Sequence, residues 1–185
     1  MGKLPLFASS SLGYKNLIKL SSTSYLESDT TLDPHCKISE LRNINEGLIL
    51  LSGNHHGLFG TLFKLNKLKQ AEEAAKELKD IFKNRFYLEI QRHNEAGEEN
   101  YENFIIKLSV DSQIPLIATQ EVFYLKKEMY EAHDALVCIG QKNFVDDPNR
   151  QKFSDQHFIK KNKDMIALFN DIPEALENNY NFSYR

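Results

Sequence analysis

The sequence predicts an α/β fold with a mostly parallel sheet, and three consecutive segments carry that prediction. Over 86–93 the side chains alternate between two faces, which is typical of a strand. Over 101–108 the apolar residues follow helical spacing, and 116–119 is a short apolar run directly after Pro115, a residue that excludes helix at that point. A strand, a helix and a second strand in this order predict a parallel βαβ unit with a right-handed crossover.

Segments before this unit continue the alternation of helices and strands. Residues 16–25 fit a short amphipathic helix, and Ser39 is an expected N-cap for a short helix ending at Leu41. Residues 47–53 read as a buried strand that ends in a glycine turn. The strongest helical pattern covers 66–83, where apolar residues form one stripe. This alternation favours an α/β domain with a largely parallel sheet or barrel.

After residue 125 the pattern becomes helical. The spacing of apolar residues predicts a helix over 128–139, followed by a turn-bearing connection over 143–150. Three shorter helices are expected over 154–159, 163–169 and 173–178, the last opened by a proline in its first turn. We therefore expect a helical C-terminal segment to follow the sheet.

Composition limits the functional classes. The chain has 185 residues, 41% of them hydrophobic, which suits one domain or one domain with an appendage. The net charge is −3, so strong direct nucleic-acid binding by this segment is not expected. Cys36 and Cys138 lie far apart and form no disulfide framework, which favours a cytoplasmic location. No apolar run approaches the roughly 18 residues that a membrane span needs, and the N-terminus lacks a secretory-signal pattern.

Polar residues follow two of the predicted strands, at the ends where parallel sheets place functional groups. His93 shares a strand face with Glu89 and Gln91, which suggests a polar cavity. The alternative is a hydrogen-bonded structural histidine. Glu121 follows the next strand and could add a carboxylate. Nothing in the sequence completes a three-ligand metal set with an open position.

Two other histidine-containing pairs have competing interpretations. His55 and His56 follow a strand and a glycine, where they could form a metal or phosphate site. Two loop histidines without a partner are the favoured interpretation, because a motif without context is only a hypothesis. His133 and Asp134 are expected to form a surface or helix-packing pair. The sequence contains no Gly-rich phosphate loop, GxSxG or HExxH motif.

Six sequence blocks in a fixed order point to a family. They are GYKNLIKL, GLILLSG, EAAKELKDIFKNRFYLEIQRH, PLIATQEVFYL, EAHDALVCIG and FSDQHFIKKNKDMIALFNDIPEALEN. Their order and spacing resemble the amino-terminal region of bacterial replicative DNA polymerase III alpha subunits over nearly the whole chain. The resemblance implies that residues 1–125 form a partial PHP (polymerase and histidinol phosphatase) domain, an incomplete, distorted β/α barrel. It implies that residues 126–185 form a helical connection toward the polymerase palm.

Departures from the family pattern fall at its metal-ligand positions. The family's HxH-like strand and TDH-like segment would lie upstream of Met1. Asn54 stands where the family usually has Cys, Glu121 where Asp is usual and Phe123 where His is usual, and a phenylalanine cannot ligate an ion. The resemblance thus implies a degenerate metal site with His93 as the remaining candidate ligand. We expect no catalytic residue, cofactor or bound divalent metal in this chain; the degenerate-site candidates are His93, Glu121, Asn54, His55 and Glu89.

Two main hypotheses follow from the resemblance. In the first, the chain is part of a polymerase alpha subunit with a structural PHP domain, and the palm carboxylates lie outside it. Its partners would be the remainder of the subunit and the proofreading subunit. In the second, it is a stand-alone metal-dependent PHP phosphoesterase; a third, weaker option is a non-catalytic interaction module. The departures and the blocks EAHDALVCIG and DIPEALEN favour the first, so the chain alone is expected to be inactive.

Overall fold

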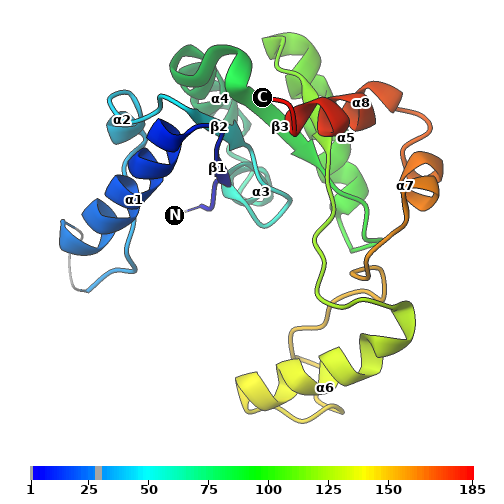
Figure 1. Ribbon diagram of the computed structural model, residues 1–185. Coiled ribbons are helices and arrows are strands. Elements are labelled where there is room, and N and C mark those ends of the chain that lie inside the picture. Colours follow the sequence, from blue (N-terminus) through cyan, green and yellow to red (C-terminus); the bar gives the residue numbers. More distant parts are fainter. Residues whose placement is uncertain (1, 28–30) are drawn as a thin grey trace.

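The computed structural model describes residues 2–27 and 31–185 and contains one open, mixed, four-stranded sheet (Figure 1). The strand order is β1-β2-β3-β4, the order of the chain. β2 pairs with β3, and β3 with β4, in parallel, whereas β1 pairs with β2 antiparallel. The strands are β1 Leu6–Ala8, β2 Leu48–Leu51, β3 Phe86–Ile90 and β4 Leu116–Ala118.

Helices occupy most of the remaining chain. They are α1 Ser11–Leu26, α2 Ile38–Leu41, α3 Leu58–Lys64, α4 Leu68–Phe82, α5 Glu98–Ser112, α6 Tyr130–Gln141, α7 Asn162–Leu168 and α8 Pro173–Phe182. Two 3₁₀ turns, η1 Lys83–Arg85 and η2 Lys127–Met129, precede β3 and α6. Among residues 2–27 and 31–185, no helix has the length and apolar character that crossing a bilayer requires.

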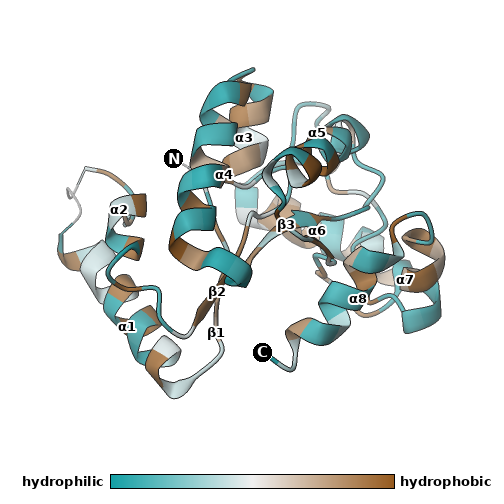
Figure 2. Ribbon diagram, turned by 90° about the horizontal axis from the view of Figure 1, so that it is seen from above, coloured by the Kyte–Doolittle hydropathy of each residue, from teal (hydrophilic) through white to brown (hydrophobic). Residues whose placement is uncertain are grey.

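The alternation in β3 divides the apolar core between the two faces of the sheet. Phe86, Leu88 and Ile90 join the larger cluster, which includes residues of α4 and α5. Tyr87 joins a smaller cluster on the other face, against which Phe182 of α8 packs. Figure 2 shows brown, apolar β2 among helices that mix brown and teal. The predicted strand over this segment is confirmed, and both of its faces are buried.

Helix α8 packs against β4, the outer strand of the described sheet, although the sequence placed α8 in a connecting segment (Figure 1). Asn178 donates its side-chain N–H to the carbonyl oxygen of Leu116 at 2.8 Å, and Asn179 donates to that of Ala118 at 2.7 Å. Unpaired edge carbonyls of a strand need hydrogen-bond donors. The amides of α8 supply them, so α8 covers this edge of the sheet.

Several sequence predictions need correction. Strand β1 was not predicted, because three residues are too few for an alternating pattern to be recognised. Ser39 lies inside α2, whose N-cap is Lys37. The helix predicted over 154–159 is absent from the described structure. That segment instead forms a parallel bridge between Tyr124 and Phe158, so its backbone groups bond to another segment of the chain.

Helix α6 lies apart from the sheet (Figure 1). It belongs to residues 126–153, which we call the α6 arm. Three backbone hydrogen bonds close the base of the arm. The N–H groups of Phe123 and Tyr124 donate to the His157 carbonyl at 2.9 and 3.4 Å, and Ile159 N–H donates to the Tyr124 carbonyl at 3.1 Å. The arm exposes large apolar side chains, which are Met129, Leu136, Ile139, Phe144 and Val145.

Candidate functional site

Polar side chains gather beyond the carboxyl ends of β2, β3 and β4. Asn54 follows β2, His93 follows β3 and Glu121 follows β4, as expected where parallel strands end at one edge of a sheet. β2 ends next to a turn at Gly53, where φ is +78°, a conformation that glycine adopts without steric cost. Asn54, His93 and Glu121 therefore lie at one edge of the sheet, whereas Glu89 lies within β3.

The first cluster crosses the sheet edge from β2 to β4. Asn54 donates to the Gln91 side-chain oxygen at 3.0 Å, and Gln91 in turn donates to a Glu89 carboxylate oxygen at 3.0 Å. The Thr119 hydroxyl donates to the same Glu89 oxygen. Burial raises the pKa of Glu89, and the hydrogen bonds from Thr119 and Gln91 partly oppose that increase. These groups satisfy one another, so they form a structural network.

His93 is held on both sides of its ring. Its Nδ1 lies 3.3 Å from a carboxylate oxygen of Glu98, and its Nε2 accepts a 3.2 Å hydrogen bond from the backbone N–H of Glu121. Since Nε2 accepts, the proton lies on Nδ1, which donates to Glu98. Glu98 also accepts from the backbone N–H of His93 at 2.7 Å. His93 is 3% exposed and offers no unused ring nitrogen.

The ionised form of Glu98 is favoured despite burial. Burial alone would raise the pKa of this carboxyl, but the side-chain and backbone hydrogen bonds from His93, together with one from the Glu95 backbone, outweigh it and lower the pKa. A buried carboxylate with several donors is stable only while those donors remain in place. Glu98 therefore joins the start of α5 to the loop after β3.

A second buried histidine, His157, comes from the segment that returns from the α6 arm. Its ring stacks with His93 at 4.1 Å between centroids and 3° between planes, and with Phe123 at 4.6 Å and 17°. Phe123 stacks in turn with His133 at 5.0 Å. Four aromatic rings therefore form a stacked column. Phe123, at the position where the resemblance expects a histidine ligand, contributes packing to this column.

His157 also makes polar contacts with two loops. Its Nε2 lies 3.0 Å from a carboxylate oxygen of Glu95, and its Nδ1 lies 3.2 Å from the carbonyl oxygen of Glu121. Burial lowers the pKa of His157, while the neighbouring Glu95 opposes that decrease. His157 was not identified from the sequence, because its partners are 36 and 62 residues away along the chain.

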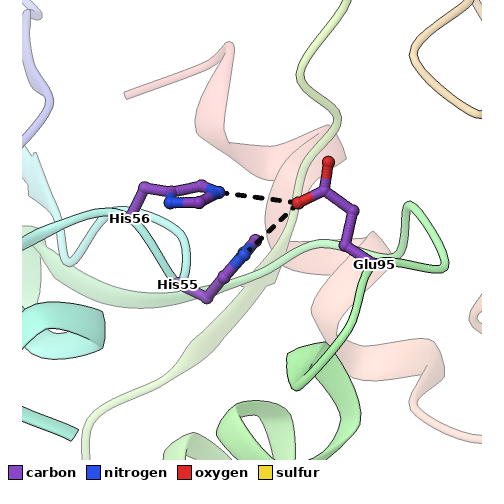
Figure 3. A group of neighbouring side chains, drawn as sticks. All are labelled: His55, His56 and Glu95. Carbon is purple, nitrogen blue, oxygen red and sulfur yellow. Dashed lines mark ion pairs between the residues drawn. The ribbon is translucent and has the colours of Figure 1, made fainter. Parts of the chain in front are cut away.

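The third cluster contains His55, His56 and Glu95, with both imidazole rings directed at one carboxylate oxygen (Figure 3). That oxygen lies 3.3 Å from Nε2 of His55 and 3.5 Å from Nε2 of His56. Burial is the main cause that lowers the pKa of His55 to about 4, with His56 and Lys64 adding to the effect. The prediction that the two histidines lack a partner is wrong, because Glu95 lies beside both.

These geometries divide the predicted site residues into those that lie in a possible metal-binding group and those that do not. In the part of the chain that the structure describes, the group able to hold a metal ion is His55, His56 and Glu95. His93 and Glu121 are not in that group. Glu95 and Glu98 were not singled out from the sequence, because loop and helix-start glutamates are common. His133 and Asp134 have different partners: Asp134 pairs with Arg150 at 2.6 Å, and His133 stacks with Phe123.

The residues at the family's metal-ligand positions do not fit a metal cluster. The Asn54 amide is hydrogen-bonded to Gln91, and His93 has both ring nitrogens engaged. Phe123 has no donor atom and stacks with His157. Ligation at these positions would break the buried hydrogen bonds described above. No reaction step is therefore assigned to a metal held there.

The chain is similar to known proteins along nearly its whole length. A model of the PHP domain family matches residues 1–93. The chain is 40% identical over 180 residues to the DNA polymerase III subunit alpha of Rickettsia bellii, 37% over 182 residues to that of Caulobacter vibrioides and 34% over 186 residues to that of Pseudomonas aeruginosa. These matches cover 97%, 98% and 100% of this chain. They cover 15%, 16% and 16% of the relatives, so the chain spans about one sixth of their length. The chain belongs to the PHP domain family, and its curated relatives along nearly its whole length are DNA polymerase III alpha subunits.

Proposed function

We propose that this chain serves as the PHP segment of a replicative DNA polymerase III alpha subunit in the cytoplasm, and that its role there is structural. The state of His93 carries the proposal. This candidate ligand stacks with His157 and uses both ring nitrogens within the protein. A histidine bonded in this way supports packing of the loops rather than ligation of an ion.

A structural role also agrees with how the returning C-terminal segment is held. Arg92, next to His93, forms ion pairs with Glu102 of α5 at 2.5 Å and with Asp171 at 2.7 Å. It also lies over the ring of Phe169, 4.8 Å from the centroid. These contacts join the loop after β3 to the segment between α7 and α8. We propose that the open sheet is part of a PHP-type distorted barrel, and that residues 126–185 lead from it toward the polymerase palm.

The α6 arm indicates the first partner. Its exposed apolar side chains lie on an element that stands away from the sheet (Figure 1). Several large exposed apolar side chains on one element favour an interaction site. The curated relatives are about six times longer than this chain, so we propose that the arm contacts the remainder of the alpha subunit. The proofreading subunit is a further proposed partner, and strong direct binding of nucleic acid by this segment is not expected.

The alternative function is that of a stand-alone metal-dependent PHP phosphoesterase. The similarity to alpha subunits continues beyond residue 93, where the PHP family match ends, and extends through the last helices. That continuation favours the polymerase interpretation over the phosphoesterase. The two functions predict different activities for the purified chain.

Hydrolysis of p-nitrophenyl phosphate with added Mn²⁺ or Zn²⁺ distinguishes them. The structural proposal expects no turnover above the rate in buffer, and the same result for His93→Ala. Turnover by the unchanged chain that His93→Ala abolishes would overturn the proposal and support the phosphoesterase. A primer-extension assay on the 185-residue chain is expected to show no nucleotide incorporation.

A further inference from the structure

We propose that His55, His56 and Glu95 form a binding site for one divalent transition-metal ion of the Zn²⁺ type. The site shares His55 with the degenerate-site candidates, whereas His56 and Glu95 are not among them. It goes beyond the proposed scaffold role, which requires no metal. The three residues lie on two loops, one after β2 and one after β3 (Figure 3).

The distances favour a shared ion over a simple ion pair. Charge-assisted hydrogen bonds between nitrogen and oxygen are about 2.7–2.9 Å long. The two contacts to Glu95 are 3.3 and 3.5 Å. Ligands about 2.0–2.1 Å from a tetrahedral Zn²⁺ are separated from one another by roughly 3.3 Å. The nitrogen–oxygen spacing therefore matches two edges of such a tetrahedron, and all three ligand atoms lie within 4.8 Å of one another.

The donor types select the class of ion. Two imidazoles and one carboxylate form a set that Zn²⁺ accepts, and such three-residue sets leave a fourth position for water or another ligand. Mg²⁺ and Ca²⁺ prefer oxygen ligands throughout, so a site with two nitrogen donors discriminates against them. His55 also lines an adjacent pocket of about 490 Å³.

Neighbouring groups already hold the ligands in place. The second carboxylate oxygen of Glu95 contacts Nε2 of His157 at 3.0 Å, which leaves the first oxygen for the ion. Hydrogen bonds of this kind orient metal-ligating carboxylates. Lys64 Nζ lies 3.4 Å from Nδ1 of His56. Ligation through Nε2 requires the proton of the neutral His56 ring to lie on Nδ1, where Lys64 can no longer donate to it. The Lys64 contact is long and its side chain is exposed, so Lys64 can move away.

An ion at this site would join three separate segments. His55 and His56 belong to the loop after β2, and Glu95 to the loop after β3. His157 connects Glu95 to the segment that returns from the α6 arm. Binding to the folded state alone stabilises it by mass action. We therefore expect Zn²⁺ to raise the melting temperature of the chain.

The test measures Zn²⁺ binding to the untagged 185-residue chain by calorimetry, after treatment with a chelator. We expect one Zn²⁺ per chain. Substitution with Co²⁺ is expected to give the visible absorption bands of a tetrahedral site, a readout independent of any activity. His55→Ala, His56→Ala and Glu95→Gln should each weaken binding by about 100-fold or more, whereas His157→Phe should weaken it by about 10- to 100-fold.

Matched substitutions control for unspecific effects. Glu99→Gln changes an exposed glutamate four residues beyond Glu95, and His35→Ala changes a histidine outside the group. Both should leave the affinity unchanged. His56 is exposed, so His56→Ala is expected to fold and tests the metal site even if His55→Ala fails to fold. Absence of stoichiometric Zn²⁺ binding, or unchanged affinity in His56→Ala and Glu95→Gln, would overturn the proposal. Phosphatase turnover would instead overturn the structural function and leave this site intact.

Discussion

His55 and His93 lie in the loops after two neighbouring parallel strands, and each is a buried histidine beside a glutamate. Their environments nevertheless differ. His93 and Glu98 form a closed pair, because backbone N–H groups use the remaining acceptors. His55 shares the single Glu95 oxygen with His56, an exposed ring, and borders a pocket. The comparison shows that the distribution of hydrogen-bond partners, and not residue type, separates a structural histidine from a candidate ligand.

The largest expected effect comes from breaking the closed pair. Glu98→Gln removes a buried charge that accepts hydrogen bonds from both the backbone and the ring of His93. We expect the free energy of unfolding to fall by about 2–3 kcal/mol, as for other buried charged hydrogen bonds. Urea unfolding measures the change, with Glu99→Gln as the exposed control. A loss below about 0.5 kcal/mol, the usual range for a surface substitution, would show that the pair is not closed as described.

The stacked column gives the next effect. His157→Ala removes a buried ring beside His93 and Phe123 and should destabilise the fold by about 2 kcal/mol, since it leaves a cavity. His157→Phe keeps the stack but loses both polar contacts, so the difference between the two variants separates packing from hydrogen bonding. Equal losses in both variants would assign the whole effect to the polar contacts. Thermal and urea unfolding both provide the measurement.

The two histidine–glutamate groups should also respond to acid in different pH windows. The pKa of His55 is lowered from 6.5 to about 4, so the unfolded chain binds more protons in this range. The contribution of His55 to stability is therefore lost as pH falls from 6.5 to about 4. The pKa of Glu98 is lowered from its ordinary 4.5, so its contribution is lost only below that value.

Unfolding measured across pH with a chelator present tests these windows. His55→Gln should flatten the profile between pH 6.5 and 4, whereas Glu98→Gln should flatten it below pH 4.5. Glu89→Gln provides a comparison in which the pKa shift, and so the change of stability with pH, has the opposite sign. Its pKa is raised by burial, so the contribution of Glu89 to stability falls as pH rises above 4.5, and the variant should lack that decrease. A profile unchanged by His55→Gln would contradict the neutral state assigned to this ring.

The smallest effect is expected at His56. Its ring is exposed, and its contact with Glu95 is long, at 3.5 Å. His56→Ala should change the free energy of unfolding by less than about 0.5 kcal/mol in the presence of a chelator. With saturating Zn²⁺ the wild-type chain should gain stability and the variant should not. A large metal-free loss in this variant would remove the contrast with His93.

The fold shows which elements local sequence patterns can predict and which they cannot. Helix α4 and the alternating strand β3 were predicted because each has a periodic pattern long enough to be recognised. Most apolar residues of both patterns are buried in the core. The three-residue strand β1 and the bridge between Tyr124 and Phe158 were missed. Both are stabilised by hydrogen bonds to distant segments, which local spacing does not record. The domain boundary at residue 125 stays a prediction. Helix α8, which follows this boundary, packs against strand β4, which precedes it.

For the candidate site, the sequence alone determined which polar residues follow the parallel strands and that Phe123 cannot ligate an ion. It also pointed to an α/β scaffold, because side-chain periodicity is a property of neighbouring residues. Only the tertiary structure decided that Glu98 closes on His93, that Glu95 joins His55 and His56, and that His157 enters the stack. The reason is physical. The state of a buried histidine depends on which donors and acceptors surround it, and here those groups include residues brought together by folding from more than 60 positions away.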